Sequence, residues 1–207
     1  MSIKIRKALS DDAPFLAQMI LQSSRAEKKV GLFDLIFGSK SDEETLQNLE
    51  KLTSATAKSY CHFSNFLIAE IDGTNVGSLC SYEPRISTRE AFLEALKEIG
   101  CEDCSKDFIE ISDACDFKLN KRTLVFDFME ELEGHMDVGI LKSLMQKSLL
   151  TARLKGYRIA QTMVEIGSLE TLLYYKKLGF KEVKIQECEL YKEKFGRAGL
   201  VLLAFEF

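Results

Sequence analysis

The chain has 207 residues, of which 46% are hydrophobic and 29% are charged, and its formal net charge is −4 at pH 7. These values are typical of a globular protein of one domain with a sizeable core. The negative charge argues against a nucleic-acid partner or an anionic membrane surface. The sequence starts without a signal-peptide core, and no apolar run approaches the roughly 18 residues of a membrane span. We therefore expect a cytoplasmic protein.

Six cysteines occur along the chain, at Cys61, Cys80, Cys101, Cys104, Cys115 and Cys188. In a chain without a secretion signal we expect free thiols rather than a disulfide framework. Cys101 and Cys104 form an isolated C-x-x-C, but a zinc site needs two further ligands, and the sequence offers no second pair or His-x-x-x-His. We expect reduced thiols there and no metal.

The N-terminal segment begins with alternating residues around Ile3 and Ile5, which predict a short strand. Ser10, followed by two aspartates and a proline, is a helix start signal, and the apolar spacing predicts a helix to about Ser24. Residues 31–38, GLFDLIFG, are apolar and have no clear period. They are either core or a helix contact, or they form a wall of a substrate pocket.

A second helix is predicted from Ser41, which has a glutamate three residues later as in a capping box, to about Lys58. The following segment reads as a β-hairpin. Its strands are Phe66–Ile71 and Val76–Tyr82, and the turn is at Asp72-Gly73.

Residues 84–122 look like an insertion in a single domain that spans 1–207. The first part, to about residue 100, has one apolar helical face. The second part is acidic and lacks a clear period. We expect this insertion to cover one end of the sheet and assign it no chemistry.

The stretch 123–180 has the clearest pattern. It opens with TLVFDFMEEL, in which Leu124, Phe126 and Phe128 alternate, and this predicts a half-buried strand. After the turn EGHMD, apolar residues recur at helical spacing over 138–156. The start of that helix presents unpaired N–H groups and a partial positive charge, which suit a phosphate.

The remaining segments continue the alternation of strands and helices. A strand is predicted over 159–166, a short helix ends at Gly179, and a third strand starts at Phe180, which together are typical of βαβ units. Residues 187–199 are expected to form a polar loop. The apolar end of the chain, 200–207, is predicted to be a strand that must be buried or paired.

The order of elements, and one local motif, resemble the GNAT superfamily of acyl-CoA-dependent N-acyltransferases. The motif is Ser168–Phe180, SLETLLYYKKLGF, where such families commonly read N-x-x-A-x-x-x-Y-x-K-L-G-F. Tyr175 falls on the tyrosine and residues 177–180 match the ending, whereas Ser168 and Thr171 depart from the pattern. The resemblance covers nearly the whole chain outside the insertion. It implies an α/β (α+β) fold with a mixed central sheet of about seven strands flanked by helices.

The pyrophosphate loop of the family, Q/R-x-x-G-x-G/A, matches this chain only at Gly139. Met136 stands at the first position and Leu141 at the second small one, and Asp137 lies beside the expected anion site. Backbone donors need no particular side chain, and Lys142 partly offsets Asp137. The resemblance implies acetyl-CoA as cosubstrate, no metal, and a set of cofactor-binding residues that comprises Leu132, Glu133, Val138, Gly139, Ile140, Leu141, Lys142 and Ser168.

The resemblance also implies a direct transfer, in which an amine attacks the thioester. The hydroxyl of Tyr175 would protonate the departing thiolate, and an amide near Glu131 or Leu132 would stabilise the oxyanion. A carboxylate takes the proton of the amine. The candidates are Asp127, Glu130, Glu131 and Glu133, of which we expect Glu131 first and Asp127 second. Alternation places these two on one strand face and Glu130 on the other. The acidic region favours a cationic amine.

Two functions stay open. The first is an N-acetyltransferase that acts on a primary amine of a small molecule or a peptide. The second is a GNAT-like binding or regulatory protein that has lost CoA binding, with the insertion or the GLFDLIFG segment as its contact surface. That segment and the apolar C-terminal strand also suggest a homodimer. His135 can touch a phosphate or act as a base, or it is a solvated turn residue.

The sequence lacks the motifs of two other enzyme classes. The sequence has no G-x-S-x-G turn for a serine nucleophile, and no G-x-G-x-x-G after a strand for a nicotinamide cofactor.

Overall fold

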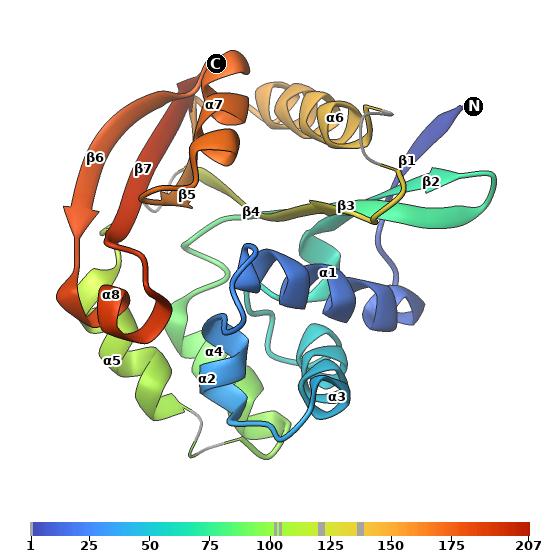
Figure 1. The fold of residues 1–207 in the computed structure, drawn as a ribbon. Coiled ribbons are helices and arrows are strands. Elements are labelled where there is room, and N and C mark those ends of the chain that lie inside the picture. Colours follow the sequence, from blue (N-terminus) through green and yellow to red (C-terminus); the bar gives the residue numbers. More distant parts are fainter. Residues whose placement is uncertain (1, 102, 104, 120–122, 136–138) are drawn as a thin grey trace.

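The computed structural model describes all residues except 1, 102, 104, 120–122 and 136–138 (Figure 1). Within the described residues the strands are β1 (Ile3–Lys7), β2 (Phe66–Ile71), β3 (Thr74–Tyr82), β4 (Leu124–Glu131), β5 (Ile159–Glu165), β6 (Lys181–Glu187) and β7 (Gly199–Glu206). The α-helices are α1 (Ala13–Arg25), α2 (Leu32–Phe37), α3 (Asp42–Thr53), α4 (Arg89–Glu98), α5 (Ser105–Cys115), α6 (Ile140–Leu154), α7 (Leu169–Lys177) and α8 (Glu189–Phe195). Two short 3-10 turns are η1 (Ser10–Asp12) and η2 (Phe63–Asn65).

The strands form one mixed sheet in the order β1-β2-β3-β4-β5-β7-β6. Strands β1 to β4 are antiparallel neighbours, β4 and β5 are parallel, and β7 lies antiparallel between β5 and β6. The predicted hairpin is confirmed, because Asp72 and Gly73 join β2 to β3 with φ of 51° and 82°, as a tight turn requires. The expected mixed sheet of seven strands flanked by helices is also confirmed.

Helices cover both faces of the sheet (Figure 1). One core lies between the sheet and helices α6 and α7, and it contains Phe126 and Leu144. The other core lies beneath the opposite face, where α1 to α4 pack, and it contains Phe33 and Phe92. The burial of Phe33 and Ile36 shows that the GLFDLIFG segment contributes to this second core as helix α2.

Strand β4 does not alternate as predicted. Leu124 and Phe126 pack toward α6, but Phe128 lies in the core on the opposite face. The pairing with β3 shifts register between Ser78 and Cys80, and Phe128 has a φ of 42°. This β-bulge adds one residue to the strand and reverses the faces that follow. Glu130 therefore faces α1, and the prediction that Leu124, Phe126 and Phe128 share one face is wrong.

Several predicted boundaries also change. Helix α3 ends at Thr53 rather than near Lys58. The acidic part of the insertion, for which we found no period, forms helix α5, and the expected polar loop 187–199 contains helix α8. Both helices pack through a small apolar cluster, so tertiary contacts stabilise what local sequence does not indicate. The single domain with an insertion at 84–122 stays a prediction.

The expectation of free thiols is wrong at one pair. Cys115, at the end of α5, forms a disulfide with Cys188, which precedes α8, across a sequence separation of 73 residues. The bridge ties the insertion to the C-terminal part of the sheet. Cys61 and Cys80 are buried thiols, while Cys104 of the C-x-x-C lies outside the described residues.

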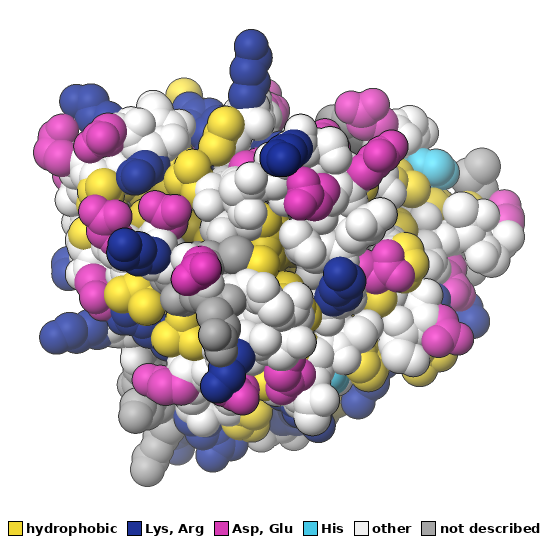
Figure 2. All heavy atoms as spheres, turned by 90° about the horizontal axis from the view of Figure 1, so that it is seen from below, with side chains coloured by type: hydrophobic (Ala, Val, Ile, Leu, Met, Phe, Trp, Pro, Cys, Tyr) yellow, Lys and Arg dark blue, Asp and Glu magenta, His cyan; other side chains and the backbone are white. Residues whose placement is uncertain are grey.

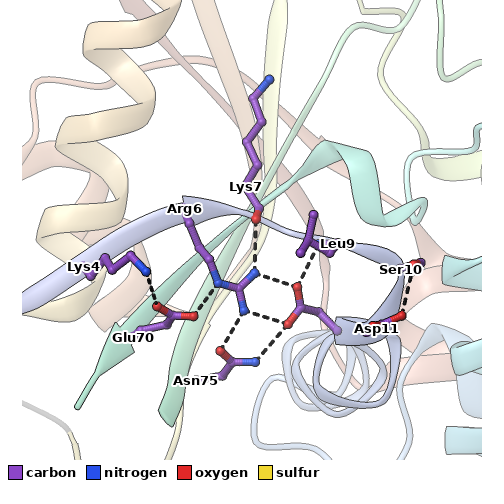
Figure 3. A network of polar contacts seen from close by, with 9 residues as sticks. Lys4, Arg6, Lys7, Leu9, Ser10, Asp11, Glu70 and Asn75 are labelled. Atoms are coloured by element: carbon purple, nitrogen blue, oxygen red, sulfur yellow. Dashed lines mark hydrogen bonds and ion pairs between the residues drawn. The ribbon is translucent and has the colours of Figure 1, made fainter. Parts of the chain in front are cut away.

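A polar network fixes the N-terminal strand to the hairpin (Figure 3). The guanidinium of Arg6 donates to both carboxylate oxygens of Asp12, at 2.7 and 2.8 Å, and also contacts Glu70 and Asn75. These hydrogen bonds, chiefly that of Arg6, lower the pKa of Asp12 to about 2. The network connects β1, the start of α1, β2 and β3.

Acidic and basic side chains are interspersed over the face seen in Figure 2. Within the described part of the chain, no helix combines the length and apolarity needed to cross a membrane. The features that suggested a homodimer are used internally, because β7 is flanked by two strands and α2 buries Phe33. The homodimer stays a prediction.

Candidate functional site

Strands β4 and β5 begin together and then separate. Among the described residues their pairing covers only Leu124 with Ala160 and Val125 with Gln161, although the two strands continue to Glu131 and Glu165. The two strands therefore separate along their C-terminal halves, and we call the space between these halves the gap. In sheets with parallel strands, ligands commonly bind beyond the carboxyl ends of the strands. This gap is the candidate active site.

Helix α6 starts beside the end of β4. Gly139 precedes its first residue with a φ of 86°, and a Cβ placed there would meet no atom of the described residues within 4 Å. Ile140 is fully buried, so its side chain does not compete for that open space. Among the predicted loop residues, Gly139, Ile140, Leu141 and Lys142 thus surround a helix N-terminus whose amides can hold an anion. Val138, like Met136 and Asp137, lies outside the described residues.

At the end of β4, some backbone N–H and C=O groups are hydrogen-bonded to β3, and the others point toward the gap. The amide of Leu132 donates to the carbonyl of Val76 in β3 at 2.9 Å, so its predicted role as oxyanion donor is wrong. Because successive residues of a strand alternate in direction, Met129 and Glu131 direct their backbone groups toward the gap. The carbonyl of Glu131 accepts a hydrogen bond from the Gln22 side chain at 3.2 Å.

Carboxyl groups surround the gap on different sides. Burial raises the pKa of Asp127 to about 6, and one of its oxygens accepts the amide of Phe128 at 2.9 Å. Burial also raises the pKa of Glu130 to about 7, against hydrogen bonds from the neutral side chains of Gln22 and Ser23. The bulge places Glu130, and not Glu131, on the side of Asp127. The expectation that Asp127 and Glu131 share a face is therefore wrong.

The two adjacent tyrosines of α7 are placed differently. Tyr175 is only 4% exposed, and its hydroxyl is hydrogen-bonded to Thr162. Thr162 is the first residue of β5 beyond the paired segment, so the Tyr175 hydroxyl lies where the gap begins. Burial raises its pKa, and the charges of Asp127 and Glu130 add to this effect.

The hydroxyl of Tyr174 is also buried, and within the described residues it has no hydrogen-bond partner. Burial raises the pKa of Tyr174 to about 12, with a further contribution from the charge of Glu131. Glu131 therefore lies on the α7 side of the sheet, close to this second phenol. Tyr174 is a polar group at the site that the sequence motif did not identify.

The remaining predicted residues lie at the rim. Glu133 is in the exposed turn that follows β4, and Ser168 precedes α7 without a side-chain cap. His135 has a buried Nδ1 atom with no partner among the described residues, so a phosphate contact stays open. No group of three potential metal ligands occurs in the described part of the chain.

Sequence reasoning ranks Glu130 below Glu131 and Asp127, and it does not identify its partner Gln22. The position of Gln22 in the sequence of α1 carries no signal for a contact 108 residues away. Glu130 was placed on the wrong face because the bulge at Phe128 has no sequence signature in a run of otherwise regular alternation. The local motif drew attention to Tyr175, and its role as proton donor stays a prediction.

Comparisons with known proteins bear on the fold. No protein-family model matches the chain, and no curated protein matches it. Solved structures do match along its full length. The chain is similar to an acetyltransferase with a TM-score of 0.71 and 19% identity, over 98% of both chains. It is also similar to an acetyltransferase of the GNAT family from Staphylococcus aureus Mu50, with a TM-score of 0.56 and 14% identity over 99% of both chains.

A third similar structure is the PaiA N-acetyltransferase from Thermoplasma acidophilum in complex with coenzyme A. Its TM-score is 0.57 and its identity 15%, over the whole of both chains. At these identities the likeness concerns the fold. The resemblance seen in the sequence is confirmed at that level, and the chain has the fold of the GNAT acetyltransferases.

Proposed function

We propose that the chain is an N-acetyltransferase that moves an acetyl group from acetyl-CoA to a primary amine of a small molecule or a peptide. The observation that carries this proposal is the gap between β4 and β5, which opens beside the start of α6. The gap has a phenol at its origin and a carboxyl group with a pKa near 7 on one wall. The similarity to an N-acetyltransferase in complex with coenzyme A supports it.

The start of α6 fits the diphosphate of coenzyme A. The amides of Ile140, Leu141 and Lys142 belong to the first turn of a helix and lack intrahelical acceptors. The open space over Gly139 allows close approach to the backbone. We assign the predicted set of Leu132, Glu133, Val138, Gly139, Ile140, Leu141, Lys142 and Ser168 to this cofactor side.

Glu130 is the proposed general base. A primary amine must lose a proton to attack, and a base works best when its pKa lies near the working pH. Burial brings the pKa of Glu130 to about 7, which meets this condition. Gln22 holds the Glu130 carboxylate through a hydrogen bond of 2.9 Å. Asp127 and Glu131, which the sequence favoured, contribute negative charge that attracts a cationic acceptor.

Tyr175 is the proposed proton donor to the departing sulfur. Its hydroxyl already lies where the strands separate, and its raised pKa keeps the phenol protonated at neutral pH. Amides on the gap side of β4 donate to the carbonyl oxygen as negative charge develops there. Thr162 keeps the phenol oriented toward the start of the gap.

Two glycines at opposite ends of α6 provide a matched test. Gly139 and Gly156 have φ of 86° and 81°, and neither would bring a Cβ within 4 Å of another atom. Either alanine variant therefore loses a similar stability, about 1 kcal/mol for a left-handed residue. Calorimetric titration with acetyl-CoA should show weaker binding for Gly139→Ala only.

A panel of cationic primary amines then tests the reaction, with acetylated product followed by mass spectrometry. Acetyl-CoA at 100 times its dissociation constant should stabilise the protein by about 2.7 kcal/mol. Absence of binding by the unmodified protein at millimolar acetyl-CoA contradicts the proposal. That result would favour a binding or regulatory protein of the same fold.

A further inference from the structure

The connection between α1 and α2 bridges the two separated strands. We call residues 26–31 the strap. Just before it, Gln22 donates to the Glu130 carboxylate at 2.9 Å and to the Glu131 carbonyl at 3.2 Å, both at the end of β4. Within it, Lys28 forms an ion pair with Glu165 at the end of β5. The chain from Gln22 to Lys28 therefore crosses from one side of the gap to the other, on the face that carries Glu130.

The contact at Lys28 is enclosed by groups that suit an ammonium ion. The side chains of Lys28 and Glu165 are only 12% and 11% exposed. The Tyr191 hydroxyl donates to the same Glu165 oxygen at 2.8 Å, and the Lys28 ammonium lies 5.4 Å from the centre of the Phe195 ring. Arg197 approaches the second Glu165 oxygen at 3.4 Å. A carboxylate and the face of an aromatic ring both attract a cation, so these surroundings favour an ammonium group.

The backbone of the strap is held in an unusual conformation. Ala26 and Glu27 are consecutive residues with φ of 44° and 67°. A Cβ at Gly31 would come within 2.5 Å of the Ser24 carbonyl oxygen, so the strap folds back closely against the end of α1. Left-handed residues other than glycine persist where the surrounding structure imposes them. The Lys28–Glu165 pair is the contact that joins the middle of the strap to the sheet.

We propose that the strap closes the acceptor side of the gap and that the Lys28–Glu165 ion pair is its latch. The ammonium group of a primary-amine acceptor competes with Lys28 for Glu165, and this exchange opens the strap. The cofactor side, at α6, is unaffected because the strap lies on the opposite face. This inference rests on the proposed function for its acceptor, but the closed strap is a property of the protein alone.

Hydrogen exchange tests the latch without any activity. In Lys28→Met, the amides of 26–31 should exchange at least about tenfold faster than in the unmodified protein, which corresponds to 1.4 kcal/mol of local opening. Lys28→Arg keeps the charge and should stay close to the unmodified protein. Lys29→Met is the matched control, since Lys29 is an exposed neighbour. Equal exchange in Lys28→Met and Lys29→Met overturns the proposal, as does an increase shared equally by β2 and β3.

Kinetics test the acceptor. Lys28→Met should lower the KM of a cationic amine by about threefold or more, because the internal competitor is gone, while the KM of acetyl-CoA changes less than about twofold. Hydrolysis of acetyl-CoA without amine should rise as water enters. A change confined to the KM of acetyl-CoA overturns the assignment to the acceptor side. An unmodified protein that neither binds nor turns over acetyl-CoA defeats the proposed function, and the exchange experiment still decides the strap.

Discussion

Asp12 and Glu130 are two enclosed carboxyl groups whose surroundings shift their pKa values in opposite directions. Asp12 receives two hydrogen bonds from Arg6, and its pKa falls to about 2. Glu130 is bonded by the neutral side chains of Gln22 and Ser23, and burial raises its pKa to about 7. The first group lies beside the paired strands β1, β2 and β3, and the second lies where β4 separates from β5. A fixed charge connects elements, whereas a group that titrates near neutrality can move a proton.

The largest effect is expected for the Asp12 network, and it is an effect on the stability of the protein. Arg6→Met leaves Asp12 and Glu70 without their shared cation, and it should lower the free energy of unfolding by about 3 to 5 kcal/mol. Denaturant titration measures the loss. Lys4→Met is the control: Lys4 also pairs with Glu70, but its side chain is 72% exposed, so the loss should be under about 1 kcal/mol. Similar losses in both variants would show that the network is not the connection we describe.

The next effect concerns catalysis at Glu130. Glu130→Gln keeps the size of the side chain and its contact with Gln22, but it cannot accept a proton. Turnover at neutral pH should fall about 100-fold or more, the usual contribution of a general base. In the unmodified protein kcat/KM should rise with pH through about 7, and the variant should lose that rise. A larger loss in Glu131→Gln than in Glu130→Gln would return the role to Glu131.

Glu130 should also make the stability of the protein depend on pH, in the direction opposite to that expected for Asp12. A pKa raised from 4.5 to about 7 means that the folded state binds the proton more tightly. The stabilisation is therefore complete below about pH 4.5 and is lost as the pH rises through 7, by about 2 kcal/mol after allowing for partial exposure. Asp12, with its lowered pKa, loses stability instead as the pH falls from 3.8 through 2.

Denaturant titrations of the unmodified protein and of Glu130→Gln at pH 5 and pH 8 measure this difference. The unmodified protein should lose more stability between the two pH values than the variant does. Identical pH dependence in the two proteins would mean that Glu130 titrates in its ordinary range.

The smallest effect is expected at Tyr175. Tyr175→Phe removes the hydroxyl bonded to Thr162, so turnover should fall by about tenfold while the affinity for acetyl-CoA stays nearly constant. Tyr174→Phe is the matched control, since the hydroxyl of Tyr174 is also buried but has no hydrogen-bond partner among the described residues. Loss of affinity in Tyr175→Phe, or loss of turnover only in Tyr174→Phe, would show that the role of Tyr175 is misassigned.

Local patterns in the sequence were sufficient for the hairpin and for most strands. Each of these depends on the spacing of residues within one segment. The features that define Glu130 depend on distant parts of the chain. The positive φ of Phe128 is imposed by packing in the α1 core, and the Gln22 contact joins residues far apart in sequence. The disulfide of Cys115 with Cys188 is of the same kind, because no spacing rule predicts a pair across 73 residues.

A titration of the Glu130 carboxyl group tests most directly whether its pKa is raised while that of Asp12 is lowered. Carbon-13 NMR of glutamate-labelled protein, with Glu130→Gln to assign the signal, follows this group alone through the pH range. We expect a midpoint near 7, well above the ordinary pKa of a glutamate side chain. A midpoint near 4.5 would contradict the assignment of Glu130 as the base at the gap.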